Sequence, residues 1–86
     1  MKYNIELARE AESDLEFLNK TDQKLFGRIL AKIETLSETP REGRALVGNH
    51  KGEFSLRVSN YRIVYELDAA KHIVYILTVK HRKHVY

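Results

Sequence analysis

The last eight residues, VKHRKHVY, hold the densest group of side chains that could bind a polyanion. Lys80 to His84 are five consecutive basic or protonatable residues, and the aromatic Tyr86 ends the sequence. Residues 1–40 contain six Lys/Arg and eight Asp/Glu, a net charge of −2, whereas residues 41–86 contain nine and four, a net charge of +5. This asymmetry favours a surface that meets nucleic acid, although an unevenly charged, solvated surface has the same composition.

A second group of polar residues lies on two predicted strands that precede this basic segment. In EFSLRV, Phe54, Leu56 and Val58 alternate with Glu53, Ser55 and Arg57, and in YRIVYEL Arg62 follows directly after the turn at Ser59 and Asn60. Side chains alternate between the faces of a strand, so Glu53, Ser55, Arg57 and Arg62 line one open surface if the polar faces of the two strands coincide. The alternative is that these arginines only pair across the strands with Glu53 or Glu66.

The rest of the chain supplies the elements that must hold this surface. Alternation over residues 3–7 predicts a strand, and helical spacing of apolar residues predicts a helix over residues 8–20. NKTDQ breaks this pattern, and a second helix is predicted to bury Leu25, Ile29, Ile33 and Leu36 and to be ended by Pro40. The segment TPREGRALVGNHKG is predicted to be a loop, and three strands follow, the last of them HIVYILTV. The predicted order is therefore β-α-α-β-β-β.

This order predicts an α+β fold in which a two-helix hairpin packs on one face of an antiparallel sheet and leaves the other face open. With 86 residues the chain is expected to form a single domain, residues 1–86. No apolar run is long enough to span a bilayer and the N-terminus does not resemble a signal peptide, so we expect a cytoplasmic protein without a membrane partner. The absence of cysteine excludes disulfides and thiolate zinc sites, and His81 and His84 have no clear carboxylate partner at metal-ligand spacing. We predict no metal and no cofactor.

Two motifs resemble a known family. LRVSNYRIVYEL followed by ILTVKHRKHVY is similar to the signature of the RelE/ParE toxin superfamily, and the predicted order of elements agrees with that family over essentially the whole chain. For RelE-like members the resemblance implies a metal-independent ribonuclease that enters the ribosomal A site, cuts translated mRNA and is held inactive by a cognate antitoxin. The expected partners are therefore an antitoxin protein, the ribosome and mRNA.

The resemblance also implies roles for single residues. Arg62 matches the strand arginine that stabilises the scissile phosphate, Arg82 the tail arginine near the leaving group, and Tyr86 the terminal tyrosine that stacks on a base. These roles agree with the chemistry, because attack of a 2′-hydroxyl on phosphorus builds negative charge on oxygens that a guanidinium can bind through two hydrogen bonds. Further contacts to the RNA are expected from Lys51, Ser55, Arg57, Lys80 and Lys83.

The general base cannot be carried over in the same way. Well-known RelE members have two lysines on the strand before the turn, at positions that Glu53 and Ser55 occupy here. Other branches of the superfamily pair a glutamate with a histidine, so Glu53 is a candidate to accept the 2′-hydroxyl proton, with His81 or His84 donating a proton to the departing 5′-oxygen.

Two alternative functions remain open. A ParE-like protein would poison DNA gyrase without cutting RNA, and a catalytically inactive RelE homologue would only bind its antitoxin. Arg82 and Tyr86 favour the ribonuclease, because ParE-like chains generally lack the catalytic arginine and tyrosine of the tail. The missing lysines favour the inactive homologue.

Overall fold

The computed structural model describes residues 2–48 and 52–84, and within them it contains two helices, a five-stranded sheet and a C-terminal 3-10 helix. The elements in chain order are β1 (Asn4–Leu7), α1 (Arg9–Thr21), α2 (Gln23–Thr35), β2 (Arg44–Ala45), β3 (Glu53–Val58), β4 (Tyr61–Asp68), β5 (Ile73–His81) and η2 (Arg82–His84). The α+β class is confirmed, and the observed order is the predicted one with one additional short strand, β2. None of the described helices is long and apolar enough to cross a membrane.

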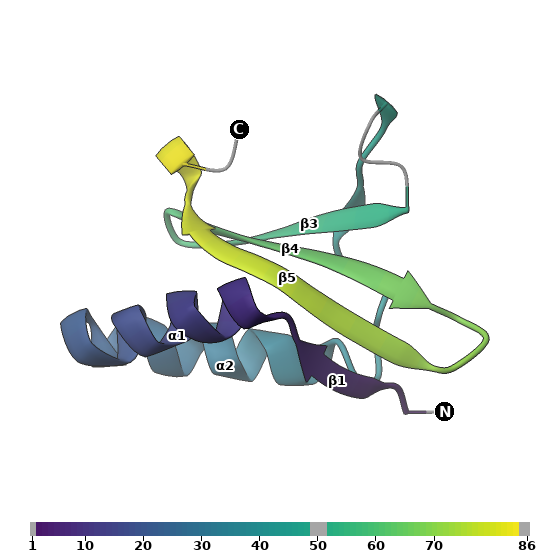
Figure 1. Cartoon of the computed structure of the whole chain (residues 1–86), viewed down its shortest axis with the longest axis horizontal. Coiled ribbons are helices and arrows are strands. Elements are labelled where there is room, and N and C mark those ends of the chain that lie inside the picture. Colours follow the sequence, from purple (N-terminus) through teal and green to yellow (C-terminus); the bar gives the residue numbers. More distant parts are fainter. Residues whose placement is uncertain (1, 49–51, 85–86) are drawn as a thin grey trace.

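The two helices form the predicted hairpin with a single residue between them. Asp22 ends α1 and caps α2, since its carboxylate accepts a hydrogen bond from the backbone N–H of Leu25 at 3.1 Å. Each helix buries one apolar stripe, which includes Leu15 and Leu18 on α1 and Ile29 and Ile33 on α2. Figure 1 shows both helices on one side of the sheet, so the opposite face has no helical cover.

The sheet has the strand order β1-β5-β4-β3-β2, and it differs from the prediction in two respects. First, β1 pairs in parallel with β5, so the sheet is mixed rather than wholly antiparallel. Parallel neighbours need a long crossover, and here the helical hairpin and the β2–β4 segment supply it. Second, the expected loop contains the short strand β2, in which Arg44 and Ala45 pair with Ser55 and Phe54. A strand of two residues is too short to show a periodic pattern.

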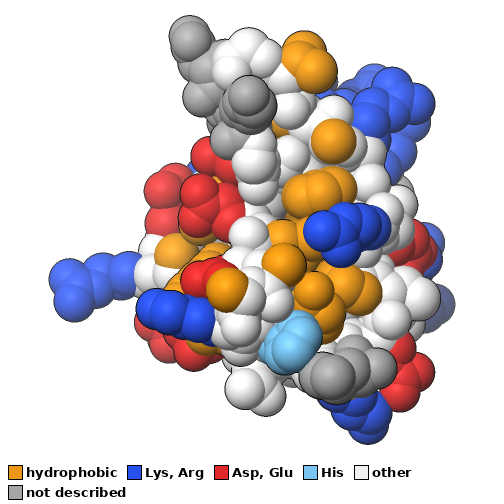
Figure 2. Space-filling model, turned by 90° about the vertical axis from the view of Figure 1, so that its right-hand side faces the viewer, with side chains coloured by type: hydrophobic (Ala, Val, Ile, Leu, Met, Phe, Trp, Pro, Cys, Tyr) orange, Lys and Arg blue, Asp and Glu red, His pale blue; other side chains and the backbone are white. Residues whose placement is uncertain are grey.

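The core lies between the helices and the covered face of the sheet. It contains fully buried side chains from both layers, including Leu18, Ile29, Ile63, Tyr65 and Ile76. Hydrophobic side chains also reach the surface: Figure 2 shows a patch of them at the end of the molecule that carries the β4–β5 turn, bordered by charged groups of both signs. The covered face thus provides the stability, and the uncovered face is available for polar side chains.

The turn between β3 and β4 consists of Ser59 and Asn60, as predicted. Ser59 has a φ of 56°, in the left-handed region that a two-residue hairpin requires and that a residue other than glycine rarely adopts. This turn places Arg57 and Arg62 at the same end of the sheet.

Candidate nucleic-acid interface

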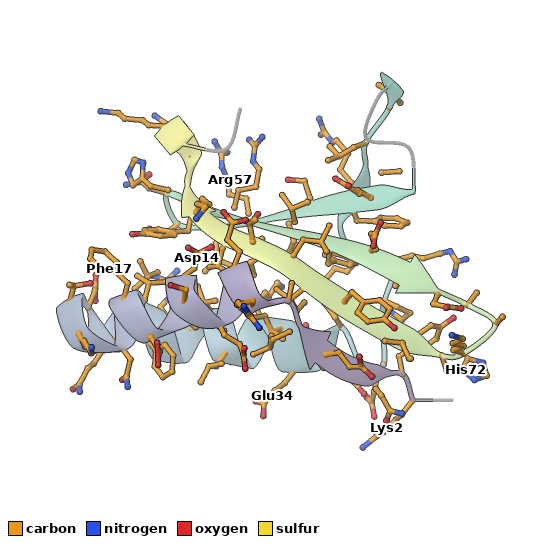
Figure 3. The ribbon with its side chains drawn as sticks, in the orientation of Figure 1. Lys2, Asp14, Phe17, Glu34, Arg57 and His72 are labelled. Carbon is orange, nitrogen blue, oxygen red and sulfur yellow. The ribbon has the colours of Figure 1, made fainter. Side chains whose placement is uncertain are left out.

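Arg57 and Arg62 lie directly opposite each other on neighbouring strands. The register pairs Arg57 with Arg62, Ser55 with Val64 and Glu53 with Glu66, whereas Phe54 and Leu56 belong to the covered face. The two arginines therefore share the open face, as the alternation predicted, and Figure 3 shows Arg57 pointing away from the helices. Like charges directly opposite each other in a sheet are destabilising, by a few tenths to about 1 kcal/mol. An anion bound between the two guanidinium groups would remove this cost.

The strand register does not set either arginine directly opposite Glu53 or Glu66, the partners that the alternative interpretation required. Glu53 and Glu66 face each other four pairs further along the strands. The β3–β4 pair thus has a basic end, at Arg57 and Arg62, and an acidic end, at Glu53 and Glu66.

A third arginine joins this pair in an open hollow of about 580 Å³ on the β2 side of the sheet. The hollow is lined by Glu42, Arg44, Leu46, Ser55, Arg57 and Arg62. Arg44 enters because β2 pairs with β3, which sets Arg44 opposite Ser55. Sequence reasoning missed Arg44, because it lies in a segment predicted to be a loop and its basic charge alone did not distinguish it from its neighbours.

The C-terminal segment begins at the same end of the sheet. The backbone N–H of Arg82 donates to the carbonyl oxygen of Asn60 at 2.8 Å, which seats η2 on the β3–β4 turn. Figure 1 shows this segment rising from the sheet on the side away from the helices. Arg82 and Lys83 are exposed there. The structure thereby brings Arg82 to the end of the sheet that carries Arg57 and Arg62.

Several predicted site residues lie outside the part of the chain that the structure describes. These are Lys51, the side chain of His84, and Tyr86. Their proposed roles stay predictions.

Lys80 is placed differently from the expectation. Its ammonium group contacts Asp14 Oδ1 at 2.7 Å and Glu10 Oε2 at 2.9 Å, both on α1, and only 29% of its side chain is exposed. The two carboxylates raise the pKa of Lys80, with Asp14 the larger cause. Asp14 Oδ2 also accepts the backbone N–H of Val79 at 2.9 Å. Lys80 therefore holds α1 against β5, and its charge is compensated within the protein.

Glu53 and His81 are not brought together. Glu53 lies four residues from Arg57, about 13 Å along an extended strand, at the acidic end of the sheet. His81 pairs with Tyr61, and the two rings meet edge to face at 5.5 Å, beside the Asp14 and Phe17 side chains of α1. A general base and a general acid must both reach the same phosphodiester, and Glu53 and His81 occupy opposite faces of the sheet. The strand register therefore contradicts the prediction that Glu53 and His81 act together as base and acid.

The remaining described groups add no metal chemistry. Over residues 2–48 and 52–84, no three His, Asp or Glu side chains gather in a way that could hold a metal ion. His72 precedes β5 with a φ of 55°, and its ring packs edge to face on the Tyr3 ring with the centroids 5.1 Å apart. Lys83 donates its backbone N–H to His81 Nδ1 at 3.3 Å, which orients the imidazole without exposing it to the open face.

Fold and site together define a class: a small α+β protein that carries several arginines on the uncovered face of its sheet. The family model described as "ParE toxin of type II toxin-antitoxin system, parDE" matches residues 5–86. The chain belongs to this family, within the RelE/ParE superfamily, and is a toxin of a type II toxin–antitoxin system. The resemblance stated from the two motifs is thus confirmed.

Individual relatives support the same assignment. The chain is 35% identical over 92 residues to toxin RelG from Mycobacterium tuberculosis, covering 100% of this chain and 98% of the relative. It is 30% identical to a chain of the toxin–antitoxin complex RelBE2 from the same organism, with a TM-score of 0.84 over 95% of this chain and 100% of that one. The isolated E. coli RelE toxin, at 22% identity, shares the fold with a TM-score of 0.79 over 92% of this chain and 83% of its own.

Proposed function

We propose that this toxin is a metal-independent endoribonuclease that cleaves translated mRNA in the ribosomal A site. The observation that carries the proposal is the meeting of Arg44, Arg57 and Arg62 in one hollow on the uncovered face of the sheet. Three guanidinium groups in one hollow suit the phosphodiester backbone better than any neutral ligand, because each can bind two phosphate oxygens.

The chemistry of the proposed reaction follows from this arrangement. The 2′-hydroxyl loses its proton to solvent and its oxygen forms a bond to phosphorus, while the bond from phosphorus to the 5′-oxygen breaks. The 5′-oxygen takes up a proton from solvent and leaves as a hydroxyl, and a cyclic phosphate is left on the upstream fragment. Negative charge grows on the phosphoryl oxygens during the attack and on the 5′-oxygen as it leaves. In this proposal Arg62 stabilises the first charge and Arg82 the second. It is supported by the register, which sets Arg57 opposite Arg62, and by the backbone hydrogen bond that joins Arg82 to Asn60 in the adjoining turn.

A protein antitoxin is proposed as the partner that keeps the toxin inactive. The RelBE2 structure from M. tuberculosis and the RelE–RelB structure from Pyrococcus horikoshii are described as toxin–antitoxin complexes. A segment that neutralises this chain would have to cover both the arginines of the hollow and nearby apolar surface, so we expect it to combine acidic and aliphatic residues. The helical layer and the exposed edge of the sheet are both open to such a segment.

The name of the matching family model favours one further candidate, a ParE-like poison of DNA gyrase. This alternative needs no phosphate-binding arginines at a reacting centre. It therefore predicts that Arg62→Ala retains full toxicity.

The deciding experiment is primer extension on an mRNA that is translated while the toxin is induced. The proposal expects new 5′ ends inside the reading frame, at codons occupied by ribosomes, and none on the same transcript with its start codon removed. Intact mRNA accompanied by accumulating gyrase–DNA breaks would establish the gyrase alternative, and intact mRNA without such breaks would favour an inactive homologue that only binds its antitoxin.

A further inference from the structure

The Tyr65 side chain combines a core position with a polar contact that the proposed mechanism does not use. Tyr65 is fully buried, and its ring stacks on the Phe54 ring with the centroids 5.3 Å apart and an interplanar angle of 13°. The hydroxyl donates to the carbonyl oxygen of Pro40 at 2.8 Å and accepts the backbone N–H of Gly43 at 2.9 Å. One oxygen atom on β4 thus holds both ends of the turn formed by residues 40–43.

This turn lies so close to the sheet that it cannot carry a side chain at Gly43. A Cβ atom there would stand 2.7 Å from the Tyr65 hydroxyl and 2.9 Å from the carbonyl oxygen of Ser55. Both contacts are shorter than carbon and oxygen atoms tolerate, so the glycine is required by the close approach of the two backbones.

The next residue after Gly43 is Arg44, which lines the hollow between Ser55 and the two strand arginines. β2 has only two residues, and one further hydrogen bond, from the backbone N–H of Leu46 to the carbonyl oxygen of Glu53 at 2.8 Å, extends its contact with β3. These contacts hold Arg44 and the residues after it, but not the turn before it. The Tyr65 hydroxyl therefore supplies much of the anchoring directly before Arg44.

A second anchor holds the turn on its other side. The Glu42 carboxylate contacts Lys32 Nζ on α2 at 2.6 Å and accepts a hydrogen bond from the Thr39 hydroxyl at 3.1 Å. The hydrogen bond from Lys32 is the main cause that holds the pKa of Glu42 below its usual range. Glu42 anchors the turn to α2, and Tyr65 anchors it to the sheet.

We propose that the Tyr65 hydroxyl is a positioning group that fixes Arg44 in the arginine hollow, so that the third guanidinium meets the RNA backbone in one orientation. This inference rests on the proposed function for what Arg44 binds, and on the observed contacts for how Arg44 is held. Burial is the main cause that raises the pKa of the Tyr65 phenol, so the hydroxyl keeps its proton and its bond to Pro40 at physiological pH.

The test of the contact itself is amide hydrogen exchange in Tyr65→Phe, which removes one buried oxygen and keeps the ring. The Gly43 amide should exchange about five- to tenfold faster, as expected for the loss of one hydrogen bond, while amides in β4 and β5 keep their protection. Tyr3→Phe is the matched control, because it removes a hydroxyl at the far edge of the sheet. An unchanged Gly43 amide would overturn the inference.

The test of the positioning role is a double-mutant cycle with Arg44→Ala, read on the affinity for a single-stranded DNA oligonucleotide that cannot be cleaved. Tyr65→Phe should weaken binding about three- to tenfold when Arg44 is present and less than about twofold in the Arg44→Ala background. Equal losses in both backgrounds would show that the hydroxyl only stabilises the fold, and would overturn the inference.

Because neither measurement needs cleavage, the two proposals can fail separately. A toxin that leaves mRNA intact but shows a non-additive cycle disproves the endoribonuclease and retains the positioning role. A toxin that cuts mRNA but shows an additive cycle supports the endoribonuclease and disproves the positioning role.

Discussion

At the scale of single residues, the arginine pair is the feature that departs most from ordinary sheet chemistry. Arg57 and Arg62 stand opposite each other where a pair of opposite charges would be more stable. A fold that retains such a repulsion gains nothing from it in the free protein, which is consistent with a site that is completed by an anion.

The first prediction concerns the proposed transition-state contacts. Arg62→Ala and Arg82→Ala should each slow cleavage of ribosome-bound mRNA by about 10² to 10³, the usual loss for one donor to the developing charge. The melting temperature should stay close to that of the parent, because the Arg82 side chain is exposed and Arg62 lies on the uncovered face. Single-turnover kinetics on programmed ribosomes measures the loss.

Lys71→Ala is the control for this pair, since it removes one positive charge from the β4–β5 turn at the other end of β4. If an arginine variant cleaves as fast as Lys71→Ala, its assigned role is wrong.

The second prediction concerns Glu53. Because the register sets Glu53 about 13 Å from the arginine pair, Glu53→Gln should cleave within about twofold of the parent rate and leave the pH profile unchanged. Single-turnover rates between about pH 5.5 and 8.5 check this. A loss of about 10² or more together with a missing acidic limb would instead place this carboxylate at the reacting phosphate.

At the scale of elements, the contact between α1 and β5 holds the two layers together next to the site. β1 pairs only with Ile73–Ile76 of β5, so the later residues of this edge have no strand beside them in the part of the chain that the structure describes. There Asp14, labelled in Figure 3, accepts the backbone N–H of Val79 and also binds Lys80. Only 13% of the Asp14 side chain is exposed, so its loss leaves a poorly solvated amide and ammonium group behind.

The third prediction follows from this contact. Asp14→Ala should lower the free energy of unfolding by about 1 to 3 kcal/mol in urea denaturation, whereas Glu16→Ala, an exposed change on the same helix, should lower it by less than about 0.5 kcal/mol. The pKa of Lys80 is raised in the folded state. The contribution of its charge to the free energy of unfolding is therefore complete below the pKa of an ordinary lysine and is lost as pH rises through the raised pKa.

Lys80→Met should consequently cost stability at neutral pH and progressively less in strong alkali. A cost that does not change with alkaline pH would mean that the lysine acts through its aliphatic stem alone.

At the scale of the whole molecule, charge is distributed by layer and by end. Half of the acidic residues in residues 1–40 lie on α1, and the arginines of the hollow gather on the uncovered face beside the C-terminal segment. If the toxin binds RNA as proposed, this separation would orient it toward the RNA before contact and make the binding sensitive to salt.

The fourth prediction is a salt dependence that reflects this arrangement. If Arg44, Arg57, Arg62 and Arg82 each neutralise one phosphate, the logarithm of the affinity for single-stranded RNA should fall against the logarithm of salt concentration with a slope of about −3. Arg57→Ala should make the slope shallower by about 0.7, and Lys71→Ala should leave it unchanged. Equal slopes for all three proteins would remove Arg57 from the interface.

The local pattern of the sequence determined the order of elements, the turn at Ser59 and Asn60, and the face on which Arg57 and Arg62 lie. Each of these depends on neighbours within a few residues, through helical or strand periodicity and turn chemistry. The family motifs added the toxin class, which the comparisons confirm.

Only the tertiary structure decided which side chains meet. Periodicity assigns a face but not a register, so the direct opposition of the arginines and the distance from Glu53 to His81 depended on strand pairing. Lys80 binds Asp14, 66 residues away in sequence. Arg44 enters the hollow because β2 pairs with β3, next to a turn that the Tyr65 hydroxyl holds. Such contacts depend on how the layers pack, and no local pattern in the chain encodes them.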